Sequence, residues 1–129
     1  MLLDSTFLHD LIRGDDAAVE KLDELIDKNT AVVISPLTVF EIGVGLRGDA
    51  ARLMPTFEAV VEDLDSAPLY REQAREAWQI QAQLLDQGER IGAVDVLLAG
   101  TAATLSDPRV LTRNVDEFER VDAIDVETY

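Results

Sequence analysis

The sequence has 129 residues, 47% of them hydrophobic, with 26 acidic side chains against 11 basic ones and a net charge of −15. This length suits one domain over residues 1–129 and is too short for two. Cysteine is absent, which excludes disulfides, thiolate catalysis and cysteine-bound zinc or iron–sulfur centres and favours a reducing, cytoplasmic setting.

The first part of the sequence predicts a strand and two helices. Residues 1–4 form an apolar run that stops at Asp4, and the Ser-Thr pair after it is suited to cap a helix over residues 7–13. Gly14 closes that helix, and the two acidic residues behind it cap a second one. Four apolar residues share one face of the second helix: Val19, Leu22, Leu25 and Ile26.

The middle of the sequence continues the alternation of strands and helices. Residues 31–35 (AVVIS) form a β-branched run of strand length, and Pro36 starts the next helix at a favoured position. Residues 37–46 are apolar nearly all round, as in a buried helix. Three further elements are expected: helices near residues 50–64 and 70–87, and a short strand at 66–69 between them.

The last part predicts a buried helix over residues 94–105, a strand over 109–112 and a short edge strand over 124–127. Strands separated by helices imply a parallel sheet with helices on both faces. We therefore expect one α/β domain with four to five parallel strands. The longest nearly apolar run, residues 96–105, is about half the length that crosses a bilayer, so no membrane segment is predicted.

Three acidic residues stand alone beside apolar segments. Asp4 ends the first strand, Glu41 is the only ionisable residue in 37–46, and Asp95 precedes the apolar run 96–103. Helix capping would also explain Asp4 and Asp95, and water or an arginine at the rim of the sheet would satisfy Glu41. Ligands of parallel sheets bind beyond the carboxyl ends of the strands, so we expect these carboxylates to converge there within a few ångströms.

A fourth candidate region follows the strand over 109–112 and supplies Thr112, Asn114 and Asp116, although a plain polar turn would explain it too. Two carboxylates about 4 Å apart repel each other by about 4 kcal/mol at an effective dielectric near 20. A cation, an arginine or a raised pKa must offset that repulsion. With no cysteine and one histidine, an all-oxygen site favours Mg²⁺ or Mn²⁺ over zinc.

Four segments resemble, in order, the signatures of PIN-domain toxins of the VapC kind: LLDSTFLHDLIRG, ISPLTVFEIGVGLRG, IGAVDVLLAGTA and VLTRNVDEFERV. The resemblance covers the whole sequence. It implies that Asp4, Glu41 and Asp95 are acidic metal ligands, and that Thr6 and Thr112 orient the site or its waters.

The family's fourth acid most often follows the Thr-Arg pair directly, and this sequence has Asn114 there. Asp116, two residues later, is a candidate to replace it, which leaves the number of bound metals open. The catalytic set that the resemblance implies therefore has six members: Asp4, Glu41, Asp95, Thr112, Asn114 and Asp116.

The function implied by the resemblance is that of a Mg²⁺- or Mn²⁺-dependent endoribonuclease, the cytoplasmic toxin of a VapBC-type toxin–antitoxin module. Such an enzyme hydrolyses RNA phosphodiesters with water activated at the metal and leaves 5′-phosphate and 3′-hydroxyl ends. The implied partners are the RNA substrate, a small cognate antitoxin that blocks the acidic pocket, and a second copy in a homodimer. The alternative is a catalytically inactive PIN-like module that only binds protein.

The net charge of −15 bears on these alternatives because an acidic surface repels a phosphate backbone. Either the protein avoids nucleic acid, or it comes from a salty, halophilic cytoplasm in which the screening length falls to roughly 3 Å at 1 M salt. The scarcity of lysine favours the salty setting. Arg13, Arg47 and Arg113, near the motif segments, are then expected to supply most phosphate contacts.

Two other hypotheses are weaker. A phosphotransfer domain needs a second acid where Thr6 stands, or a late lysine, and no lysine follows Lys28. The single histidine, His9, would be a general base in another scheme, but a histidine early in a first helix is more often a surface or packing residue.

Overall fold

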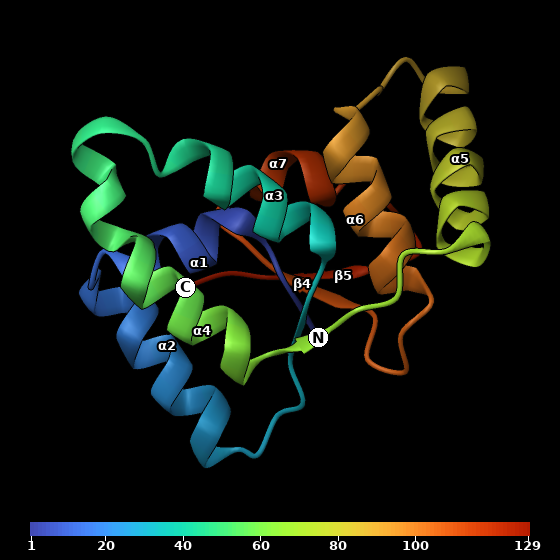
Figure 1. The fold of residues 1–129 in the computed structure, drawn as a ribbon. Coiled ribbons are helices and arrows are strands. Elements are labelled where there is room, and N and C mark those ends of the chain that lie inside the picture. The colour runs from blue at the N-terminus through green and yellow to red at the C-terminus, as the bar shows by residue number, and fades with distance from the viewer.

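Five parallel strands form a single sheet in the structure, a computed structural model that describes residues 1–129 (Figure 1). The strands are β1 (Leu2–Leu3), β2 (Val33–Ile34), β3 (Asp65–Ser66), β4 (Arg109–Leu111) and β5 (Asp125–Glu127). Their order in the sheet is β3-β2-β1-β4-β5, so β1 is central. The predicted parallel sheet is confirmed, with β5 at one edge.

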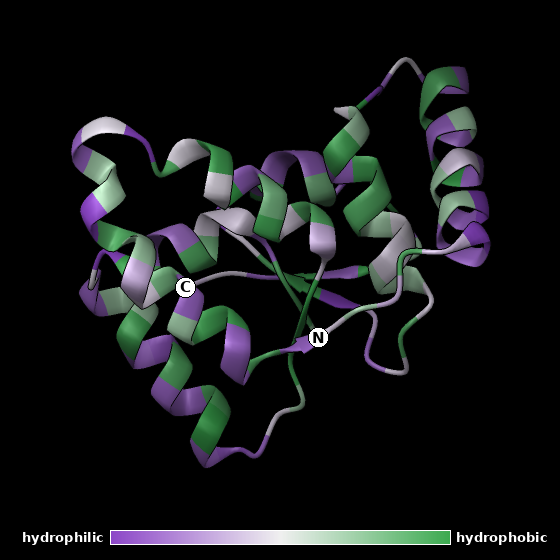
Figure 2. Ribbon diagram, viewed as in Figure 1, coloured by the Kyte–Doolittle hydropathy of each residue, from purple (hydrophilic) through white to green (hydrophobic).

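Helices cover both faces of this sheet, as predicted. They are α1 (Ser5–Ile12), α2 (Asp16–Asp27), α3 (Pro36–Gly45), the 3-10 helix η1 (Gly48–Leu53), α4 (Met54–Asp63), α5 (Arg71–Asp86), α6 (Ala93–Ala103) and α7 (Val115–Phe118). Alternate strand residues point to opposite faces. Leu2 therefore joins a core with residues of α5 and α6, whereas Leu3 joins one with residues of α1 to α4. Figure 2 shows hydrophobic residues on the central strands and mixed surfaces on the surrounding helices.

Several predicted boundaries were wrong, for local reasons. Helix α1 begins at Ser5 rather than at residue 7, because Asp4 itself is the N-cap. The helix expected from residue 50 starts as η1 and becomes α-helical only at Met54, with Pro55 in the first turn of α4. Strand β3 covers Asp65–Ser66 and not residues 66–69. None of the helices has the length and hydrophobicity required to cross a membrane.

Two helices expose apolar residues that the sequence placed in the core. On α2, Val19 and Ile26 are 40% and 65% exposed, and the buried side consists of Ala18 and Leu25. Helix α3 is not buried all round, because Phe40 is 69% and Val44 48% exposed. The α3 helix packs its inner side against the core and leaves an apolar outer side on the surface.

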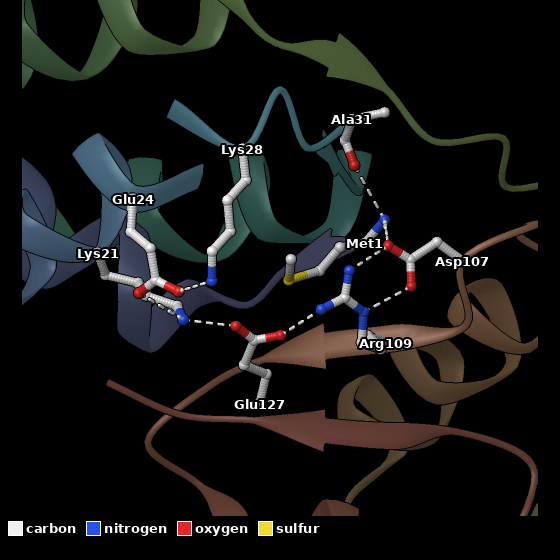
Figure 3. Close-up of polar contacts among 8 residues, drawn as sticks. All are labelled: Met1, Lys21, Glu24, Lys28, Ala31, Asp107, Arg109 and Glu127. Atoms are coloured by element: carbon white, nitrogen blue, oxygen red, sulfur yellow. Dashed lines mark hydrogen bonds and ion pairs between the residues drawn. The ribbon is translucent and has the colours of Figure 1, made fainter. Parts of the chain in front are cut away.

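A chain of polar contacts joins the edge strand β5 to α2 and β4 (Figure 3). Glu127 accepts hydrogen bonds from Lys21 of α2 and from Arg109 of β4, and Arg109 also binds Asp107 with two nitrogens. Burial lowers the pKa of Lys21, but its contacts with Glu127 and Glu24 outweigh burial and leave that pKa raised. These contacts hold β5 in register beside β4.

The close approach of α5 and α6 at Gly100 leads to a first prediction about the stability of the fold. A Cβ on Gly100 of α6 would lie 2.6 Å from the backbone nitrogen of Ala77 in α5. We expect Gly100→Ala to destabilise the fold by about 1–3 kcal/mol, because the two helix backbones must separate. In the control Gly43→Ala, the new Cβ meets only a ring atom of Phe57 at 3.9 Å. That control should be neutral or stabilising by about 0.5–1 kcal/mol. Equal urea midpoints for both variants would contradict the close packing.

Candidate functional site

The predicted acids lie on segments that meet at the carboxyl end of the sheet. Asp4 follows β1 and Thr112 follows β4, and these two strands are neighbours. Glu41 belongs to α3, and Asp95 belongs to the first turn of α6. Figure 1 shows α3, α6 and α7 gathered on this side of the molecule, above the central strands.

Asp4 is held by two threonine hydroxyls. Thr6 and Thr112 donate to the Asp4 Oδ2 atom over 2.9 and 2.7 Å, and Asp4 is buried. The two hydroxyl oxygens in turn accept backbone N–H groups, Thr6 from Arg113 at 3.1 Å and Thr112 from Asn114 at 2.9 Å. A hydroxyl has one hydrogen to give, so these amides direct both hydroxyl hydrogens to the aspartate. Asp4 thus caps a helix and is also fixed in orientation.

The other oxygen of Asp4 is much less engaged. Its Oδ1 atom has only the Ser5 hydroxyl nearby, at 3.5 Å, which is long for a hydrogen bond between oxygens. Burying a carboxylate oxygen without a strong partner is costly. Asp4 therefore has one oxygen fixed by the fold and one available to a ligand.

Glu41 faces Asp4 from α3. Partial burial raises the pKa of Glu41, the negative charge of Asp4 raises it further, and a hydrogen bond from Ser5 acts in the opposite direction. A carboxyl group in this position is more easily protonated than one in water. The Glu41 side chain is half-buried, so it remains accessible to solvent at the rim of the sheet.

Asp95 is the most perturbed acid of the group. Burial, contact with Glu117, and the charges of Asp4 and Glu41 raise its pKa to about 7. The loop ahead of α6 is pinned by Gln81, whose amide nitrogen donates to the carbonyl of Ile91 at 2.8 Å. Asp95 therefore lies at the fixed beginning of α6, and three other carboxylates share the site with it.

Glu117 is the acid that the sequence analysis did not single out. It lies on the single-turn helix α7, beside Asp95, and its Oε2 atom is buried with no hydrogen-bond partner. Asp116, which the sequence analysis named as a candidate to replace the acid missing at Asn114, is exposed. Asn114 is half-buried and contributes its backbone N–H to Thr112. The structure therefore brings together Asp4, Glu41, Asp95, Thr112 and Glu117.

The carboxylates surround the site more loosely than expected. No three histidine or acidic side chains are close enough to ligate one cation together in this conformation, so the expected convergence within a few ångströms is not reached. The donor set nevertheless fits a divalent cation. It offers only oxygen atoms, and both Asp4 Oδ1 and the orphaned Glu117 Oε2 need a partner. Hard cations such as Mg²⁺ and Mn²⁺ prefer such ligands.

A cleft of about 420 Å³ opens between α1 and α3 beside these carboxylates. Glu41 lines one side of it, and His9 lies on α1 with its Nδ1 4.0 Å from Asp10. Ile42 is the only hydrophobic residue among those that line the cleft. Its members are Ser5, Thr6, His9, Asp10, Glu41, Ile42, Gly45 and Arg113.

Comparison with known proteins gives the same family as the sequence motifs. The model of the PIN domain family matches residues 1–124 of the chain. Ribonuclease VapC19 of Mycobacterium tuberculosis is 35% identical over 118 residues, which cover 91% of this chain and 90% of that relative.

Solved structures show the same fold. VapBC2 from Rickettsia felis, bound to a DNA fragment from its promoter, gives a TM-score of 0.86 at 21% identity and covers 99% of this chain and 97% of that one. DNA-bound VapBC from Salmonella typhimurium gives 0.82 at 27% identity, covering 98% and 96%. VapBC-5 from Mycobacterium tuberculosis, described as a member of the VapBC family of toxin–antitoxin systems, gives a TM-score of 0.68 at 22% identity and covers 98% of this chain and 94% of that one.

Proposed function

The chain belongs to the PIN-domain family, and on that premise we propose that it is a divalent-metal-dependent endoribonuclease, the toxin of a VapBC-type pair. The mycobacterial relative is named a ribonuclease, and one fold neighbour is a member of the VapBC family of toxin–antitoxin systems. The substrate is RNA, and the reaction is hydrolysis of a phosphodiester.

The cluster of four acidic side chains is the observation on which this proposal rests. Asp4, Glu41, Asp95 and Glu117 come from four separate segments of the chain. Burial, contact with Glu117 and the charges of Asp4 and Glu41 raise the pKa of Asp95 to about 7, and burial and the charge of Asp4 raise the pKa of Glu41. A fold maintains such repulsion where it serves a ligand, because perturbed acids cluster at functional sites. A bound Mg²⁺ or Mn²⁺ lowers the pKa of water and neutralises charge on the reacting phosphate.

The chain's own residues prepare the site for these tasks. The threonines hold Asp4 so that Oδ1 stays turned away from the fold's hydrogen bonds. Glu41 of α3 and Glu117 of α7 supply further carboxylates, and the α1–α3 cleft leaves room for the flanking nucleotide. Water is partly excluded, because Asp4 and Thr112 are buried.

The same surface suits a basic antitoxin. The chain has a net charge of −15, and the cleft is lined by the carboxylates of Asp10 and Glu41. Asp10 is already paired with Arg113, so a cationic side chain of the partner would bind Glu41 directionally. Phe40 and Val44 on the outer side of α3 give the partner apolar surface next to Glu41. A homodimer remains part of the proposal.

A pair of neighbouring acids tests the proposal and the assignment of Glu117. Glu117→Gln should lower Mg²⁺- or Mn²⁺-dependent RNA cleavage by about 100-fold or more, since several kcal/mol of charge stabilisation is lost and about 1.4 kcal/mol equals tenfold. Asp116→Asn, in the same helical turn but exposed, should cleave like the wild type. Initial rates on a fluorescent RNA, with and without chelator, measure both.

The reverse ranking, with Asp116→Asn inactive and Glu117→Gln normal, would restore the sequence-based choice of Asp116. Cleavage that persists in excess chelator would remove the metal from the proposal altogether.

A further inference from the structure

The side chain of Arg113 lines the cleft and is 43% exposed, yet two of its guanidinium nitrogens are paired with carboxylates. Its Nη1 is 3.1 Å from Asp10 of α1, and its Nη2 donates to Asp15 at 3.0 Å. Its guanidinium carbon lies 4.5 Å from the centre of the Tyr129 ring. The guanidinium therefore has carboxylates at two of its nitrogens and an aromatic ring against one face.

Tyr129, far from Asp10 in the sequence, is the third contact of Arg113. Its hydroxyl donates to Asp10 at 2.8 Å, and its ring meets Phe7 edge-on with 5.0 Å between centroids. Burial and the hydrogen bond to Asp10 raise the pKa of Tyr129. Asp15 is fixed as well, because its Oδ2 caps α2 by accepting from Ala18 at 3.1 Å. The partners of Arg113 are thus held in place independently of it.

These contacts do not suit a phosphate-binding arginine, the role expected for Arg113 from the sequence. Two carboxylates already neutralise its charge, so an incoming phosphate would meet Asp10 and Asp15 as well. Repulsion by those two acids offsets the attraction of the guanidinium. The arginine is better placed to hold its own backbone than to hold RNA.

Two hydrogen bonds in series connect the backbone of Arg113 to Asp4. Its N–H donates to Thr6 Oγ1 at 3.1 Å, and Thr6 donates to Asp4 Oδ2 at 2.9 Å. If the 112–114 turn shifts, the amides that orient both threonine hydroxyls shift with it. Asp4 would then lose the arrangement that keeps its Oδ1 available.

We propose that Arg113 is a positioning residue of the nuclease site, anchored by Asp10, Asp15 and the Tyr129 ring, and that it holds the turn which orients Asp4. This inference rests on the proposed function, because its role is to keep Asp4 ready for the cation. It separates Arg113 from residues that contact RNA.

Steady-state kinetics and Mn²⁺ titration calorimetry test this role together. Arg113→Ala should lower kcat and weaken Mn²⁺ binding, each by about 10- to 100-fold, as is typical when a partner of a metal ligand is removed. The KM for RNA should stay unchanged. Arg113→Lys should recover part of both losses, because lysine can pair with one carboxylate but cannot reproduce the planar fork. The control Arg75→Ala removes an arginine that is exposed on α5 and makes no ion pair.

A second variant tests the same anchor in case Arg113→Ala does not fold. Tyr129→Leu keeps apolar contact with Phe7 but removes the ring and hydroxyl, and it should shift kcat and Mn²⁺ affinity in the same direction. A raised KM with normal kcat and normal Mn²⁺ affinity in Arg113→Ala would make Arg113 an RNA contact and overturn the inference. Unchanged kinetics would overturn it too. A wild-type protein that neither binds Mn²⁺ nor cleaves RNA would instead overturn the proposed function.

Discussion

Asp95→Asn is expected to abolish RNA cleavage and at the same time to stabilise the metal-free protein. Activity should fall by about 100-fold or more, because a charged oxygen at the cation site is lost. Stability should rise, because Asp95 ionises at an unfavourable position beside Glu117, Asp4 and Glu41. We expect a gain of about 3–6 °C in melting temperature at pH 8 in chelator, since about 1 kcal/mol shifts a domain of this size by that amount.

The pH dependence of that gain has a definite sign. The pKa of Asp95 is about 7 in the folded protein against an ordinary value of 3.8. The folded state therefore binds this proton more tightly, and the wild type loses stability as the pH rises from about 4 to 7. The advantage of Asp95→Asn should be largest above pH 7 and should vanish near pH 4. Thermal melts at both pH values measure it.

The matched control for this experiment is Glu58→Gln, which removes an exposed acid from the middle of α4. It should leave cleavage unchanged and alter the melting temperature by less than Asp95→Asn. An Asp95→Asn protein that cleaves RNA at the wild-type rate would show that the reaction does not pass through this site. A lower melting temperature would show that Asp95 supports the fold rather than straining it.

Expression of this chain alone in a bacterial host is expected to arrest growth, and co-expression of its antitoxin should relieve the arrest. The antitoxin is a small protein, probed by co-expressing the product of the adjacent open reading frame. Its basic side chain should occupy the acidic cleft, and its apolar residues should cover the outer side of α3 at Phe40 and Val44. The pair should co-purify in strong salt, because apolar burial is not screened.

Asp4→Asn provides the decisive comparison for this experiment. It keeps the size of the side chain and most of its hydrogen bonds, so the variant should fold and still bind the antitoxin while no longer arresting growth. If the wild-type chain is harmless and Asp4→Asn behaves identically, the toxin function fails. An inactive, protein-binding member of the PIN family would then be the better description.

Three of the four acids could be found from the sequence because each stands alone. Asp4, Glu41 and Asp95 interrupt apolar stretches in which any other charge is absent, and a buried lone carboxylate demands an explanation. The parallel order of the strands then placed them at one end of the sheet. What the sequence could not give was their spacing, which depends on side-chain rotamers.

Glu117 escaped notice for a geometric reason. In α7 the buried Phe118 and the half-buried Val115 define the inner face. At about 100° per residue, Asp116 and Glu117 both lie about 130° from the middle of that face, on opposite sides. Helical periodicity therefore cannot choose between them. The choice is made by α6, which approaches from the side of Glu117.

The exposed apolar residues of α3 were missed for a different reason. Phe40 and Val44 follow a pattern that is apolar all round, and such a pattern predicts burial whether the cover is the chain itself or another molecule. A single chain carries no information about which of the two applies. The surplus of apolar residues in α3 is thus better explained by complex formation than by folding of the monomer.

The placement of β1 at the centre of the sheet has a consequence for the cell that makes this protein. Asp4 is translated before the rest of the site, because its threonine partner stands at position 112 and Glu117, the neighbour of Asp95, follows later still. A growing polypeptide cannot assemble the site until residues 112–117 have left the ribosome. At roughly 5–20 residues per second, that delay lasts for several seconds of synthesis. The candidate site is therefore incomplete in the nascent polypeptide for most of its synthesis.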